Sequence, residues 1–245
     1  RFVFLLIVLM ILSLLGMAYI FLLPQLGRVK LPSVSLPSFP KESKLSSTST
    51  PVVPKRDEAV ASSTPSEKRF NLAGASLAQI TSMVASEKSK GTLAGSLKNL
   101  IFTEGEGQAI ISASRLLSFT NAQAPDMLTR SLDNKITVGF FGETNGGATP
   151  FIILKVTAHD TSLAGMLDWE DSLPRYFDAF FGTTIKKDPR TSLRFHDLVI
   201  LKKDTRVLEV PFGGTLGYAF ANENTIVIAG SRTALEALLP LAEKN

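Results

Sequence analysis

An almost continuous apolar segment opens the chain, before any pattern typical of a soluble domain. Phe2–Leu23 holds only Leu, Ile, Val, Phe, Met and Ala apart from Ser13, Gly16 and Tyr19. A helix of that length, rising about 1.5 Å per residue, spans the roughly 30 Å hydrocarbon core of a bilayer. A cleavable signal peptide has a shorter apolar region, of about 7–15 residues, and then a small-x-small site, which this chain lacks after the run. We therefore expect residues 2–23 to be a retained transmembrane helix whose partner is the lipid bilayer.

Residues 24–69 have a different pattern, in which apolar residues are sparse and proline recurs. Seven of the 13 prolines lie here, among Ser, Thr and Lys. Each proline removes a backbone donor and favours extended geometry in the residue before it, so a helix does not form. The segment buries little apolar surface and is typical of a semi-extended spacer. We expect a Pro/Ser/Thr-rich disordered tether over 24–69, followed by one domain over 70–245.

Helical and strand periodicities alternate through residues 70–245. Apolar residues at helical spacing predict a helix within Leu72–Lys88, and a short apolar run predicts a strand over Leu97–Thr103. Ile110–Phe119 and Pro125–Leu132 have the pattern of two short helices, with proline at a favoured first-turn position.

The second half has clearer turn signals. A strand beginning at Lys135 and a strand from Phe151 flank the turn Asn145–Gly147. A helix from Ser162 is broken by Pro174, with Ser172 as the expected cap of its second piece. An antiparallel meander follows, and Ser231 is expected to cap a last helix. The meander strands are predicted over Asp197–Leu201, Arg206–Val210, Leu216–Phe220 and Thr225–Ile228, with a turn over Lys202–Thr205.

This order of elements predicts the fold class. Runs of antiparallel strands with helices between them are typical of α+β domains. We expect one α+β domain with a mainly antiparallel sheet and helices packed on one face.

Charge is unevenly divided between the segments. Residues 1–69 hold nine of the 26 Lys and Arg and four of the 22 Asp and Glu, a net of +5, which leaves −1 for residues 70–245. Nucleic-acid binding needs a basic face on a folded module, so we expect no nucleic-acid partner. The tether lysines are expected to be solvated, or else attracted to anionic lipid headgroups.

No catalytic signature is present. The chain has no cysteine, which excludes thiolate nucleophiles and disulfides. His159 and His196 lack the spacing of metal ligands, and there is no G-x-S-x-G elbow. Gly105–Gln108 resembles the start of a phosphate loop but lacks the third glycine and a lysine, so a turn is expected there. We expect no enzymatic activity, no catalytic or metal site and no cofactor.

Two features near residue 170 have alternative interpretations. Asp168 and Asp171 share a helix face at i, i+3, which suits either solvated helix charge or a carboxylate pair. Trp169, the only tryptophan, lies beside the apolar stripe. It is expected either to pack the helix onto the sheet or to contact a partner, since tryptophan is frequent in interface hot spots.

Three stretches resemble an uncharacterised family of single-span membrane proteins from candidate-phylum bacteria. They lie in 149–170, with G-M-L-D-W-E at its end, in K-D-T-R-V-L at 203–208, and in 218–228. The resemblance covers about residues 95–241. It implies a bacterial protein of the cytoplasmic membrane whose C-terminal domain lies outside the cytoplasm. It implies no activity and no functional residues.

Orientation from charge alone stays open. Arg28 and Lys30 follow the span, and the positive-inside rule weakly favours a cytoplasmic side for them. The chain begins at Arg1 rather than Met, so we expect residues upstream whose charges are not counted. We follow the resemblance and expect an extracytoplasmic domain.

Three functions are compatible with these features. The first is a non-enzymatic envelope interaction or scaffold protein, whose partner is an envelope protein or wall component. The second is a pilus or secretion-machine subunit resembling alignment-type inner-membrane proteins, which join one span to a small α+β domain. The third is a cell-wall or peptide hydrolase, which the scarcity of histidine and the absence of cysteine disfavour.

Overall fold

The protein is represented by a computed structural model that describes residues 65–183, 194–210 and 214–244. They belong to a compact unit over residues 58–245, separate from a unit over 1–57. The predicted membrane helix at 2–23 and nearly all of the predicted tether lie outside the described residues. Within the described part of the chain, no helix is both long and apolar enough to cross a membrane.

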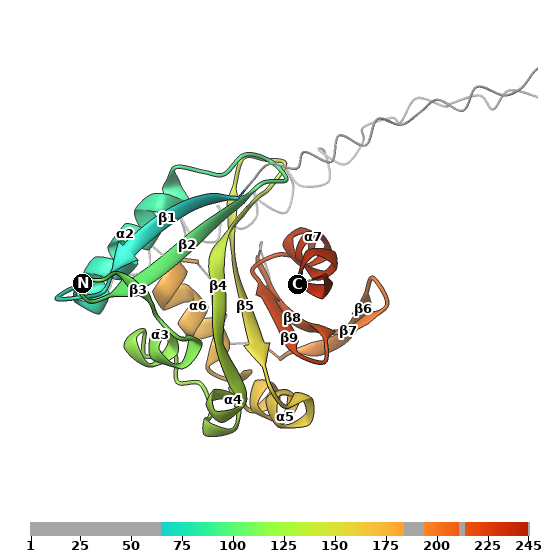
Figure 1. The fold of residues 1–245 in the computed structure, drawn as a ribbon. Coiled ribbons are helices and arrows are strands. Elements are labelled where there is room, and N and C mark those ends of the chain that lie inside the picture. The colour runs from blue at the N-terminus through green and yellow to red at the C-terminus, as the bar shows by residue number, and fades with distance from the viewer. Residues whose placement is uncertain (1–64, 184–193, 211–213, 245) are drawn as a thin grey trace, which may run out of the picture. The chain divides into compact units, whose positions relative to one another are not determined.

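The described residues form a mixed α+β domain built on a large, mostly antiparallel sheet (Figure 1). Its order is β1-β2-β4-β5-β9-β8-β7-β6, with the short β3 beside β2. Only β1 and β2 pair in parallel, because the helix α2 connects them. The strands are β1 (Ser66–Asn71), β2 (Leu97–Glu104), β3 (Ala109–Ile110), β4 (Leu132–Gly142), β5 (Ala148–Val156), β6 (His196–Ile200), β7 (Lys203–Val210), β8 (Gly214–Asn222) and β9 (Thr225–Ala229).

Helices cover both faces of this sheet, so the prediction of helices on one face is wrong. The alternation of side chains along a strand divides the core into two clusters. Phe140 and Ile152 belong to one cluster, and their neighbours Phe141 and Phe151 to the other. We call the two sides the five-helix face and the α7 face. The five-helix face carries α2 (Leu77–Ser89), α3 (Ala113–Phe119), α4 (Asp126–Ser131), α5 (His159–Trp169) and α6 (Leu173–Phe181), whereas α7 (Arg232–Glu243) alone packs on the other.

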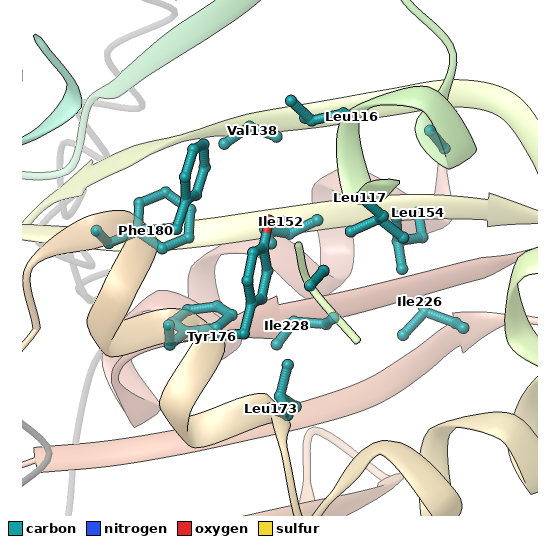
Figure 2. Packing of buried hydrophobic residues seen from close by; sticks show 14 of the residues in the cluster. Leu116, Leu117, Val138, Ile152, Leu154, Leu173, Tyr176, Phe180, Ile226 and Ile228 are labelled. Atoms are coloured by element: carbon teal, nitrogen blue, oxygen red, sulfur yellow. The ribbon is translucent and has the colours of Figure 1, made fainter. Parts of the chain in front are cut away.

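The larger cluster is rich in aromatic residues from α6. Figure 2 shows side chains of α3 and α6 gathered over strands β4, β5 and β9. The Tyr176 and Phe180 rings stack with their centroids 5.7 Å apart, and Phe180 meets Phe181 edge to face at 4.8 Å. Such pairs add stabilisation beyond the burial of their area. The apolar side of the strongly amphipathic α6 therefore packs this helix onto the sheet.

Local signals placed most elements correctly and missed some ends. Ser231 caps α7 as predicted, its Oγ accepting from the Ala234 N–H at 3.0 Å. Ser172 precedes α6 as predicted, but its side chain makes no capping hydrogen bond there. The first meander hairpin, between β6 and β7, turns at Leu201 and Lys202, both with positive φ, so the predicted turn over 202–205 is too long.

The N-terminal boundary of the domain also differs from the prediction. Strand β1 begins at Ser66, so the last residues assigned to the tether pair with β2. Only Phe70 of this strand is buried, where its ring stacks on Phe102. A mostly charged edge strand has no apolar alternation, which explains why the sequence pattern did not predict it. Ile110 likewise lies in β3 and not in a helix.

Candidate functional site

The three stretches that carry the family resemblance converge around one arginine. Glu170 follows α5 as its C-cap, Arg206 lies in β7, and Tyr218 lies opposite Arg206 in β8. Arg206 Nε and Nη2 donate to the two Glu170 oxygens at 2.8 and 2.9 Å. Tyr218 Oη donates to Glu170 Oε1 at 2.7 Å. The end of α5 is thereby joined to the sheet by paired, charge-assisted hydrogen bonds.

The rest of the Arg206 guanidinium is also occupied. Nη1 donates to Asp197 Oδ1 at 3.0 Å, and Nη2 donates to the Phe195 carbonyl at 3.4 Å. The hydrogen bonds to Glu170 are the main cause that raises the pKa of Arg206, against the effect of burial. Because its donors are used within the domain, we assign this arginine a structural role in connecting α5 to the sheet.

Close helix packing explains why the G-M-L-D-W-E stretch has a glycine at its first position. A Cβ built on Gly165 would lie 2.6 Å from the backbone nitrogen of Leu128 and 2.7 Å from its Cβ. Helices α4 and α5 therefore approach each other too closely there for any side chain. Gly165 and the residues bonded to Arg206 thus have structural roles. These roles account for parts of the three resemblance stretches without a bound ligand.

Trp169 is fully buried, with 0% of its surface exposed. Its Nε1 donates to the Ala122 carbonyl at 2.9 Å, and its ring lies 5.7 Å from that of Tyr176. The indole is thus satisfied inside the core. The partner-contact interpretation of Trp169 is corrected here, because the ring is not accessible in this fold.

The polar residues singled out near α5 do not form a site. Asp168 and Asp171 are exposed and line neither of the two cavities described below. His159 packs on the ring of Phe220 at the start of α5, while His196 is exposed in the edge strand β6. Among the described residues, no group of three His, Asp or Glu could hold a metal ion. Gly105–Gln108 forms a turn, as expected.

A different polar site occurs inside the sheet, where one strand ends before its neighbours. Ala229, the last residue of β9, pairs with Phe151 on one side and Gly217 on the other. Strand β5 begins three residues before Phe151, and strand β8 begins three residues before Gly217. Gly230 still bonds Pro150 in this region, so beyond it Ala148–Thr149 and Gly214–Thr215 flank a gap with no strand between them in the described structure. We call this two-residue gap the sheet slot.

The slot is open on both faces of the sheet. On the five-helix face is a cavity of about 210 Å³, whose lining includes Lys88, Phe177 and Thr183. On the α7 face is a cavity of about 460 Å³, whose lining includes Glu143, Glu209 and Ser231. Both cavities share Thr149, Gly214, Thr215 and Gly230. One backbone hydrogen bond, from the Gly230 N–H to the Pro150 carbonyl at 3.0 Å, marks the end of the slot toward β9.

The α7 face of the slot is held by a carboxylate. Glu143 accepts hydrogen bonds at one oxygen, Oε1, from Thr149 Oγ1 at 2.8 Å and Ser231 Oγ at 2.5 Å. Ser231 Oγ at the same time caps α7, so its hydroxyl is already used as donor and as acceptor. A serine held in this way serves to fix the start of α7 beside the β4–β5 turn.

The five-helix face of the slot carries one cation. Lys88, near the end of α2, is half-buried, and its Nζ donates to the Gly182 carbonyl at 2.9 Å. Burial lowers the pKa of Lys88, and the charge of Asp178 acts in the opposite direction. Lys88 therefore places a positive group on this side of the slot, with the Asp178 charge acting on it.

No pattern in the sequence predicts this site. The slot arises from the register between β5, β8 and β9, which are far apart along the chain. Its lining residues, among them Thr, Gly, Glu and Lys, form no recognisable motif along the chain. Only the length of β5 and β8 beyond the end of β9 identifies it, and strand ends are the least predictable part of an element.

Comparison with known proteins identified no relative. No protein-family model, no curated protein and no solved structure matches the chain. What the described domain defines is a class, a mixed α+β domain with a nine-stranded sheet in its described part. Membership of the family named above remains a prediction.

Proposed function

We propose that this chain is a non-enzymatic interaction protein of the bacterial envelope. Residues 2–23 hold it in the cytoplasmic membrane, and the tether presents the α+β domain outside the cytoplasm. The apolar run and the proline-rich segment support the membrane attachment. The resemblance supports the side of the membrane and the bacterial source.

The sheet slot is the observation that carries the interaction role. Its two walls are the edges of strands that continue past a missing neighbour. An extended peptide that adds a strand to such an edge gains main-chain hydrogen bonds and places alternate side chains on opposite faces. Strands β5 and β8 both pair antiparallel with β9, so they run in the same direction. A peptide continuing the direction of β9 is therefore antiparallel to both walls.

The chemistry of the lining favours binding over catalysis. The described lining offers hydroxyls, carboxylates, one ammonium group and backbone, and the one serine that contacts a carboxylate is fixed as a helix cap. A nucleophilic site needs a base oriented toward a group that is free to attack. The slot therefore suits a segment of another envelope protein.

A slot-filling variant tests this function. Thr215 lines the slot from β8 and, because its neighbour Leu216 lies on the five-helix face, its side chain lies on the α7 face. Thr215→Tyr covers that opening of the slot while keeping a residue type frequent in strands. Full-length protein in detergent micelles is incubated with a pool of random hexapeptides, acetylated and amidated at their ends, and bound peptides are identified by mass spectrometry. We expect enrichment on the unmodified chain and its loss on the variant.

Thr157→Tyr is the matched control, since it makes the same replacement at an exposed position just after the C-terminal end of β5. It is expected to keep the enrichment. Equal enrichment on the unmodified chain and on Thr215→Tyr, or none on either, would overturn the peptide-binding role.

A further inference from the structure

Strand β6 ends the sheet on the side away from β1 and pairs only with β7 within the described part of the chain (Figure 1). The opposite edge strand, β1, carries the charged run Glu67–Arg69, and such charges disfavour the addition of another strand. Strand β6 lacks this protection. Its Val199 is 64% exposed, and the carboxylate of its one acidic residue, Asp197, is bonded to Arg206. The β6 edge is therefore suited to strand pairing.

The turn after β6 shows which backbone groups this edge offers. A two-residue turn, Leu201–Lys202, joins β6 to β7 and has positive φ at both positions. A turn of this type closes on a hydrogen-bonded pair, here that of Ile200 with β7, and such pairs alternate with non-hydrogen-bonded ones along the ladder. Leu198 therefore also directs its backbone groups toward β7, whereas the N–H and C=O groups of Asp197 and Val199 point to the open edge.

Antiparallel pairing of β6 with its own copy is closed by a two-fold axis, and three positions of the axis are possible near the middle of the strand. An axis at Asp197 places two carboxylates directly opposite each other, which is destabilising. An axis at Val199 pairs Asp197 with Leu201, whose left-handed backbone does not continue a strand. An axis at Leu198 pairs all five residues of His196–Ile200 and sets each Asp197 opposite a Val199 of the second copy.

We propose that two copies of this chain pair antiparallel through their β6 strands, with Leu198 on the two-fold axis. Asp197 and Val199 of the two copies then exchange the backbone hydrogen bonds of the open edge. On the α7 face, the two Leu198 side chains lie against each other. On the five-helix face, the exposed Val199 lies beside an aspartate whose charge Arg206 offsets. This interface is separate from the sheet slot and does not depend on peptide binding there.

Single cysteines test the register, because the chain has no cysteine of its own. In a non-hydrogen-bonded pair the two Cα atoms are about 4.5 Å apart, which a disulfide bridges. Leu198→Cys meets its copy in such a pair, whereas Val199→Cys meets its copy only diagonally, at about 7–8 Å. Full-length protein in detergent micelles is oxidised with copper phenanthroline, and the cross-linked dimer is measured on a non-reducing gel.

We expect most of the Leu198→Cys protein to be cross-linked. Val199→Cys is expected to stay at the level of Leu167→Cys, the control on α5, although Val199 is 64% exposed and Leu198 is only half-exposed. A collision between unpaired domains would give the opposite order, because the more exposed cysteine would react faster.

Charge at residue 199 tests which residue faces it. Val199→Glu sets like charges against the two aspartates, whereas Val199→Lys sets opposite charges there. In the Leu198→Cys background, we expect Val199→Glu to form the dimer about tenfold more weakly than Val199→Lys, a difference of about 1.4 kcal/mol. Leu167→Glu and Leu167→Lys are the matched controls and are expected to cross-link equally. Circular dichroism checks that the variants stay folded, since Asp204 of β7 also lies opposite Val199.

Three results would overturn the proposed dimer. The first is cross-linking of Leu198→Cys no greater than that of the Leu167→Cys control, which would show that the β6 edge does not pair between copies. The second is cross-linking of Val199→Cys equal to that of Leu198→Cys, and the third is equal dimer formation by Val199→Glu and Val199→Lys. Peptide enrichment on the slot is measured independently, so failure of the dimer and failure of the peptide-binding function are distinguishable.

Discussion

Glu170 and Arg206 are joined by two parallel hydrogen bonds, from Nε to Oε1 at 2.8 Å and from Nη2 to Oε2 at 2.9 Å. The pair links the end of α5 to β7, the strand next to the β6 edge of the sheet. Their side chains are 15% and 24% exposed, so the interaction is screened less than a surface ion pair. It connects two of the stretches that carry the family resemblance, which gives those stretches a structural explanation.

Removing one partner of this pair is expected to be costly. Arg206→Met leaves the Glu170 carboxylate partly buried with Tyr218 as its remaining donor. We expect the free energy of unfolding to fall by about 2–3 kcal/mol, slightly less than for a fully buried pair. Urea denaturation followed by circular dichroism measures it. The control Arg232→Met breaks an exposed i, i+4 pair with Glu236 and is expected to cost about 0.5 kcal/mol or less. Equal losses in the two variants would contradict the assigned role of Arg206.

Gly165→Ala is expected to separate α4 from α5. Alanine usually stabilises a helix by about 1 kcal/mol relative to glycine. Here its Cβ would meet the Leu128 backbone at 2.6 Å, and backbone atoms are not able to rotate away. We expect a net loss of about 2 kcal/mol, typical of overpacking. The exposed neighbour Ala164→Ser is the control, with a change within about 0.5 kcal/mol. A stabilised Gly165→Ala protein would show that the helices are farther apart than described.

The two described tyrosines predict a loss of stability at alkaline pH. Burial is the main cause that raises the pKa of Tyr176 and of Tyr218 above the ordinary value of 10.0, and for Tyr218 the hydrogen bond to Glu170 acts in the same direction. The folded state therefore keeps both protons at a pH where the unfolded chain releases them. Their contribution is fully present below about pH 10 and is lost as pH rises beyond it.

Absorbance at 295 nm in a Tyr19→Phe background measures this, because only Tyr176 and Tyr218 then report. Between pH 10 and 11 we expect no phenolate signal from the folded protein, and a signal that appears together with unfolding at higher pH. A phenolate signal from a protein that is still folded at pH 10 would contradict the described burial.

The absence of cysteine makes the orientation of the domain directly testable. Ser231, at the start of α7, is a poor labelling position because its hydroxyl is bonded to Glu143 and caps the helix. Glu223→Cys in the exposed β8–β9 turn is better. With the domain outside the cytoplasm, a membrane-impermeant thiol reagent labels intact cells expressing this variant. Labelling that requires lysis would place the domain in the cytoplasm and overturn the proposed location.

Patterns that are local in the chain determined much of this fold. The alternation around Val138 and Ile152, with the turn at Asn145–Gly147, predicted the β4–β5 hairpin. A side-chain oxygen at Ser231 sufficed to predict the start of α7, because a helix start depends on a few neighbouring residues. The α+β class followed from the order of such elements.

Only the tertiary structure decided what those elements face. Strands β5 and β9 place alternate apolar residues on both sides, and the sequence does not say that one late helix, α7, covers the second side. Tryptophan is a residue type frequent in interfaces, yet Trp169 packs against Tyr176 and is part of the core. Burial is a property of contacts between distant segments, which local spacing does not encode.

The sheet slot and the Arg206–Glu170 pair illustrate the same division. Sequence by itself determined an apolar run that fits a bilayer, a proline-rich segment without helical pattern, and a domain with alternating strands and capped helices. The register of β5, β8 and β9 then decided that two strands continue past a third, and so that Lys88 borders the slot on one face and Glu143 and Glu209 border it on the other. Register depends on the summed packing of both faces of the sheet, so it emerges only when the whole core is assembled.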